Sequence, residues 1–259
     1  MSTRHSRGNT GPVLDGLRVV EGRLLWVGRM LYSPVHRIAF AHYPKTAGTS
    51  IGNWFTQAFP DAFPVSRRNP HYSVRKSLAR LSSGWMITRW KRASLRLLPF
   101  AGRSAGRPEP NPIDDIRIVG VVRSPFQMLV SLYEYWQRLE ACPDPRNPWM
   151  KAARERRFRE FLRLAVHADR AVPYEQFFNV GGRAWPRTRL VQFDQLEQGL
   201  RDALNGFGME VPVTLPRSNR APSRGRPLAD YEAEAGPLLS EVHRRFRWYD
   251  DNRETFAGV

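Results

Sequence analysis

Short apolar runs alternate with longer amphipathic segments along much of the chain. Three of the apolar runs predict buried strands, at residues 37–43, 116–122 and 189–193. Each run is followed by a segment whose apolar residues have helical spacing. These predicted helices cover residues 50–59, 124–140 and 194–204. Because strands and helices alternate, the sequence predicts an α/β domain with a central parallel sheet flanked by helices.

Other segments also have helical spacing, at residues 73–81, 85–98, 149–170 and 231–246. The region from Val13 to Leu31 is ambiguous. Its apolar residues recur three and four positions apart, which favours an amphipathic helix. Its three glycines would each weaken such a helix by about 1 kcal/mol. A hairpin that turns at Glu21 and Gly22 is therefore an alternative.

These elements divide the chain into two parts. Residues 1–36 form a polar tail and the ambiguous amphipathic segment, which either packs on the domain or docks on a membrane surface or partner. Residues 37–259 form a single domain with a basic insertion at about 62–112. Residues 62–108 contain 11 Lys and Arg and no acidic residue, and residues 102–112 are rich in Gly and Pro.

Charge and composition narrow the class of protein. The net charge of +17 predicts an anionic partner: nucleic acid, a phosphate or sulfate ligand, a polyanion or a membrane surface. A hydrophobic fraction of 41% excludes wholesale disorder. The single cysteine, Cys142, excludes an internal disulfide framework and a multi-cysteine zinc site. Residues 1–16 lack the apolar core of a signal peptide, so we expect a cytoplasmic protein.

The most informative motif is Pro-Lys-Thr-Ala-Gly-Thr-Ser at residues 44–50, between a predicted strand and a predicted helix. The free amides at a helix N-terminus favour an anion, and Gly48 allows a ligand to approach the backbone closely. Lys45 adds a positive charge but precedes Gly48, so the loop is not a Walker A motif. An ordinary strand-to-helix turn is the alternative interpretation.

This loop resembles the 5′-phosphosulfate-binding loop of sulfotransferases that use 3′-phosphoadenosine 5′-phosphosulfate (PAPS), and is most similar to carbohydrate sulfotransferases and their bacterial relatives. The resemblance implies a P-loop-like three-layer sulfotransferase fold, with PAPS as the sulfuryl donor and no metal. It implies that Lys45 is catalytic and also binds the cofactor. The cofactor-binding residues that it implies in this loop are Lys45, Thr46, Ala47, Gly48, Thr49 and Ser50.

The family has a second motif, in which an Arg after a strand and a Ser eight residues later hold the 3′-phosphate. Arg123 and Ser131 fill these two positions, with Pro125 between them. A guanidinium fork and a hydroxyl are suitable donors to a phosphate. Arg-x-Pro alone would be a helix cap with a surface Arg, but in this order and at this distance from the first loop the match is specific.

Further residues follow from the resemblance. In the family, a late basic loop closes over the 3′-phosphate and adenine, so Arg224 and Gly225 are expected to bind the cofactor, with Arg226 behind them. The acceptor hydroxyl needs a general base. His71 is the favoured candidate because related enzymes often place a His or Glu between the two motifs. The alternatives are His42, Glu134 and Glu140.

The expected reaction is therefore in-line transfer of a sulfuryl group from PAPS to a hydroxyl of a carbohydrate or glycoconjugate acceptor. Trp85 and Trp90 interrupt the basic stretch, which would line a cleft for an anionic glycan or touch an anionic membrane that carries a lipid-linked acceptor. The alternatives are a nucleotide-dependent P-loop kinase, a basic protein that binds nucleic acid or another polyanion, and a catalytically silent sulfotransferase-like binder. We do not expect a nucleic-acid partner, because no nucleic-acid motif is present.

Overall fold

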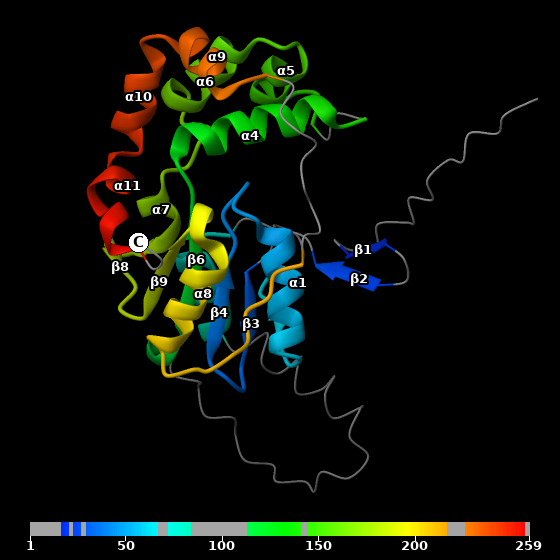
Figure 1. The fold of residues 1–259 in the computed structure, drawn as a ribbon, viewed down its shortest axis with the longest axis vertical. Helices are drawn as coiled ribbons and strands as arrows, with labels where there is room; N and C mark the ends of the chain where they lie inside the picture. Colours follow the sequence, from blue (N-terminus) through cyan, green and yellow to red (C-terminus); the bar gives the residue numbers. More distant parts are fainter. Residues whose placement is uncertain are drawn as a thin grey trace, which may run out of the picture.

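The computed structural model describes residues 17–20, 23–26, 30–66, 72–83, 113–140, 144–216 and 226–256. At its centre lies a five-stranded sheet in the order β5-β3-β4-β6-β9 (Figure 1). The strands β4 (Ile38–Ala41), β6 (Arg117–Val122) and β9 (Thr188–Gln192) are parallel. The strands β3 (Leu31–Ser33) and β5 (Phe63–Pro64) extend the sheet in the antiparallel sense.

The sheet confirms the three predicted strands and corrects the prediction that all of its strands are parallel. The chain enters β4 from β3 through a four-residue turn that ends at Arg37, whose φ is 52°. So short a connection can only join antiparallel neighbours, because parallel neighbours need a crossover of a dozen or more residues. The strands β3 and β5 were not predicted, since two or three residues are too few to carry a periodic signal.

Each face of the sheet packs against helices, which gives three layers (Figure 1). In β4, Ile38 and Phe40 belong to one core with α1 (Gly48–Ala58) and α8 (Leu196–Asn205). Ala39 and Ala41 of the same strand belong to the opposite core. That second core includes side chains of α2 (Val74–Ser82), α4 (Pro125–Arg138) and α7 (Tyr174–Phe178).

The second core extends into a helical layer beyond the sheet (Figure 1). This layer contains α5 (Pro148–Arg154), α6 (Phe158–His167), α9 (Leu228–Ala235), α10 (Leu238–Arg245) and α11 (Arg247–Asn252). The predicted helices over residues 149–170 and 231–246 are each broken in two. The breaks fall at Arg156, whose φ is 60°, and at Gly236, whose φ is 53° and which Pro237 follows. Left-handed residues and proline both interrupt a helix.

The remaining predictions have mixed outcomes. The helices expected over 50–59, 73–81, 124–140 and 194–204 are confirmed within one or two residues at each end. The helix expected from Val13 is wrong, because β1 (Leu17–Val20) and β2 (Arg23–Trp26) form the alternative antiparallel hairpin. A further short hairpin joins β7 (Asn179–Val180) and β8 (Arg183–Ala184). The helix expected over 85–98 lies outside the described residues.

Among the described helices, none combines the length and the apolar content that crossing a lipid bilayer would require.

Candidate functional site

Three adjacent parallel strands, β4, β6 and β9, end at one edge of the sheet, and each is followed by a residue of the candidate site. Lys45 follows β4, Arg123 follows β6 and Phe193 follows β9. Crevices at the carboxyl ends of parallel strands are the usual ligand sites of α/β sheets. The two motifs, which are far apart in the sequence, therefore begin side by side.

The loop between β4 and α1 has an unusual backbone. Lys45 and Ala47 both have left-handed conformations, with φ of 62° and 57°, which non-glycine residues rarely adopt. Thr46 between them is fully buried, and its hydroxyl donates a hydrogen bond of 2.8 Å to the carbonyl of Tyr43. The Thr46 side chain therefore holds the loop in shape through this bond.

Gly48, the first residue of α1, is required because the loop passes directly over a histidine. A Cβ atom at this position would overlap the imidazole ring of His42. That ring is only 8% exposed and stacks on the ring of Phe40 at a centroid distance of 6.2 Å. His42 thus supports the loop from below, and its position does not suit a base that faces an acceptor.

The N-terminus of α1 offers amides to an anion. Its N-cap residue is Ala47, whose side chain cannot accept a hydrogen bond from the first amides, and its first turn contains no acidic residue. Thr49 and Ser50, in that turn, are half-buried. Free amides and the helix dipole favour negative charge at such a helix end.

Lys45 lies in a crowded, electropositive environment. Its Nζ atom lies 4.0 Å from the centroid of the Tyr135 ring, on α4. Burial is the main reason that the pKa of Lys45 is lowered to about 8; the positive charges of Arg138 and Arg123 contribute to this fall, and Glu134 opposes it. An anionic ligand would relieve both the burial penalty and the repulsion, so the site is poised to receive one.

Arg123 is held over an aromatic ring. Its guanidinium lies 4.2 Å from the centroid of Phe193. Ser131, half-buried on α4, lies one helical turn before Tyr135 and two turns before Arg138. Ser131, Tyr135 and Arg138 therefore lie on one face of α4, and Lys45 contacts this face through the Tyr135 ring. The face thus lies next to residues of both motifs.

A cavity of 730 Å³ adjoins the loop. Ala47 and Ser50 line it on one side, and the segments Phe193–Gln198 and Leu215–Pro216 line the rest. Its walls are mixed: Phe193 and Leu196 are apolar, whereas Glu197 is already bonded to the amide of Leu215 at 3.0 Å. The cavity is large enough for a ligand of nucleoside size beside the loop that follows β4.

The other predicted residues have different outcomes. His71, Arg224 and Gly225 lie outside the described residues. Arg226 is described, and its guanidinium pairs with Glu234 and donates to the carbonyl of Asp230. Arg226 therefore fastens the start of α9.

Two acidic candidates for the base differ in their surroundings. Glu134 is buried, its charge acts on Lys45, and it accepts a hydrogen bond of 3.4 Å from the hydroxyl of Tyr231. Glu140 is exposed just beyond the end of α4. Of the two, only Glu134 acts on the pKa of Lys45.

Sequence reasoning missed four residues that shape the site, namely Tyr135, Arg138, Phe193 and Tyr174. The first two could have been found, since they follow Ser131 at helical spacing on the predicted helix. Phe193 was seen only as the last residue of a strand. Tyr174 carries no local signal, because its role depends on contacts made across the fold.

Comparison of the chain with models of protein families, with curated proteins and with solved structures finds no match. Across the described ranges, no group of three or more His, Cys, Asp or Glu residues is arranged to hold a metal ion.

Proposed function

We propose that this protein is a PAPS-dependent sulfotransferase with a P-loop-like three-layer fold, acting on a hydroxyl of a carbohydrate or glycoconjugate. The observation that carries the proposal is the placement of Lys45 and Arg123 after two hydrogen-bonded parallel strands, each next to a helix N-terminus. One ligand with two separated phosphates would engage both. The proposal also rests on the resemblance of both motifs to those of sulfotransferases.

The cofactor would lie along this edge of the sheet. The amides from Thr46 to Ser50 would hold the 5′-phosphate, and Arg123 with Ser131 would hold the 3′-phosphate. The cavity beside Phe193 would take the nucleoside. Arg224 and Gly225 follow closely on Pro216 of that cavity in the sequence, which is compatible with their closing over the nucleotide.

In the proposed reaction, the acceptor oxygen forms a new bond to sulfur while the bond from sulfur to the phosphate oxygen breaks in line. The leaving group is adenosine 3′,5′-bisphosphate. Lys45 would place its ammonium on the bridging oxygen, where negative charge develops. The proton of the acceptor hydroxyl would pass to a base. His71 remains our first candidate, and Glu134 is the best placed of the described alternatives.

An exposed aromatic ring beside Lys45 supports a sugar acceptor. The Tyr135 side chain is 42% exposed although its ring contacts the Lys45 ammonium. Such a ring can pack against the apolar face of a sugar, and Arg138 nearby could pair with an anionic group. A glycan acceptor is therefore favoured over an acceptor lipid reached at a membrane surface.

Two measurements test the proposal. Titration calorimetry should show tighter binding of adenosine 3′,5′-bisphosphate than of AMP, and the difference should vanish in Arg123→Gln. Incubation with radiolabelled PAPS and extracts of the native cell should then label a glycan fraction with wild type but not with Lys45→Gln. Magnesium-dependent use of ATP would instead indicate a kinase. Steeply salt-dependent binding to a random duplex, without affinity for the bisphosphate, would indicate a nucleic-acid-binding protein.

A further inference from the structure

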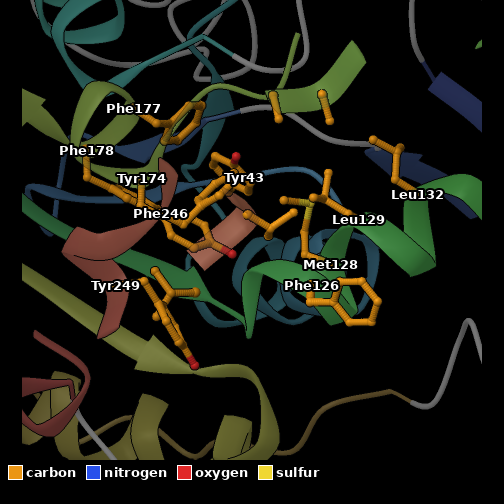
Figure 2. Close-up of a cluster of buried hydrophobic side chains, with 14 of the residues drawn as sticks. Tyr43, Phe126, Met128, Leu129, Leu132, Tyr174, Phe177, Phe178, Phe246 and Tyr249 are labelled. Atoms are coloured by element: carbon orange, nitrogen blue, oxygen red, sulfur yellow. The ribbon is translucent and has the colours of Figure 1, made fainter. Parts of the chain in front are cut away.

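A buried aromatic cluster surrounds Tyr43, the residue just before the first motif (Figure 2). Tyr43, two residues before Lys45, packs its ring at 4.5 Å from that of Tyr174, the first residue of α7. Phe177 and Phe178 of the same short helix also contact the Tyr43 ring, at 5.1 and 6.3 Å. Tyr43 and Tyr174 are 3% and 0% exposed, so their hydroxyl groups must be bonded within the protein.

The Tyr174 hydroxyl is bonded to the backbone of Arg123 in both directions. It donates to the Arg123 carbonyl at 2.7 Å and accepts from the Arg123 amide at 3.2 Å. Arg123 lies between two regular elements, because the pairing of β6 with β9 ends at Val122 and α4 begins at Pro125. The tyrosine hydroxyl therefore holds the arginine backbone where neither the sheet nor the helix does.

Tyr174 is itself fixed by its neighbours. Its ring packs against Phe246 and Tyr249 from the C-terminal helices, at 5.6 and 5.8 Å. Figure 2 shows these rings grouped around Tyr43 and Tyr174. Burial strongly raises the pKa of Tyr174, so its hydroxyl stays protonated and can donate at any physiological pH.

The residues just before Tyr174 also form hydrogen bonds, with Tyr43 beside the first motif and with Arg245 on α10. The Tyr43 hydroxyl donates to the carbonyl of Val172, and the guanidinium of Arg245 donates to the carbonyl of Ala171 at 2.6 and 3.0 Å. Residues 171–174 thus contact the residue that precedes the phosphate loop, the backbone of Arg123 and helix α10. The orientation of Arg123 depends on contacts that come from outside its own motif.

We propose that Tyr174 is a positioning residue that, through its hydroxyl, orients Arg123 toward the 3′-phosphate of the nucleotide. This inference rests on the proposed function. The Arg123 guanidinium is planar, with N–H donors in fixed directions. A small rotation of the Arg123 backbone would therefore displace the guanidinium and weaken its charge-assisted hydrogen bonds to the 3′-phosphate. The 5′-phosphate, which the amides of α1 would hold, does not depend on this contact.

The test compares two ligands on the Tyr174→Phe variant, which keeps every ring contact and removes only the hydroxyl. We expect its affinity for adenosine 3′,5′-bisphosphate, measured by titration calorimetry, to fall severalfold, with about tenfold as the most that one hydrogen bond of ordinary strength could transmit through Arg123. Its affinity for AMP should change less than twofold. The ratio of the two affinities does not depend on the fraction of folded protein, since both ligands bind the same folded molecules. Tyr32→Phe is the matched control, because Tyr32 is equally buried and belongs to the same core but lies on β3.

A second comparison separates positioning from general stability. In the Arg123→Gln background, adding Tyr174→Phe should change neither affinity, because the group that Tyr174 orients is absent. An unchanged preference for the bisphosphate in Tyr174→Phe would overturn the inference, as would an equal loss of both ligands. If wild type itself does not prefer the bisphosphate to AMP, the proposed function has failed instead.

Discussion

The charge state of Lys45 should make nucleotide binding depend on pH in a range where few other groups titrate. The experiment varies pH across the pKa of the Lys45 ammonium, which burial and the charges of Arg138 and Arg123 lower to about 8. The charged form dominates below that pH. Since the pKa is about 8, roughly three quarters of the molecules carry the charge at pH 7.5 and about one tenth at pH 9. Only the charged form can pair with the phosphate.

The expected change in nucleotide affinity follows from these charged fractions. A bound anion beside Nζ raises the pKa of Lys45, so binding takes up a proton. Affinity for adenosine 3′,5′-bisphosphate should therefore fall about eightfold between pH 7.5 and 9, in proportion to the charged fraction. The phosphates of the ligand have second pKa values of about 6, so they are fully ionised throughout this range.

Titration calorimetry at several pH values measures this fall directly. At pH 8.5, repeating the titration in two buffers of different ionisation enthalpy should show uptake of about 0.8 proton per ligand. Lys45→Arg is the control, because its guanidinium stays charged and its affinity should be flat over the same range. A flat profile for wild type, or an equal fall in Lys45→Arg, would refute the assignment of Lys45 to the phosphate.

Three further predictions concern packing and the base. Gly48→Ala would push a methyl group into the His42 ring; it should lower the free energy of unfolding by about 1–3 kcal/mol and also weaken nucleotide binding, because the loop must shift. Gly120→Ala would meet the Phe178 ring, so we expect a similar loss of stability in urea denaturation, and an undiminished unfolding midpoint would contradict the packing described. His71→Ala should lower turnover and leave affinity for the bisphosphate nearly intact; full turnover would exclude His71 as the base.

Local chemistry in the sequence was enough to locate the parallel strands and the helices that follow them. Continuous apolar runs mark strands that are buried on both faces, and Ser124-Pro125 marks the start of a helix. The strands β3 and β5 could not be found, because they are too short for periodicity; β3 forms by pairing with β4, and β5 by pairing with β3. The break at Arg156 could not be found, because an arginine gives no local sign of a left-handed conformation. The break at Gly236 could have been found, since Gly followed by Pro is a helix stop.

What the sequence alone determined is the chemistry of two separate motifs: a lysine and small residues before one helix, and an arginine before another. Their meeting at one sheet edge depends on the pairing of β4 with β6, which joins residues some eighty positions apart. The lowered pKa of Lys45, the ring of Phe193 under Arg123 and the hydroxyl of Tyr174 also arise only in the folded chain. Burial, charge proximity and hydrogen bonding are properties of positions in space, and nothing in the local sequence encodes them.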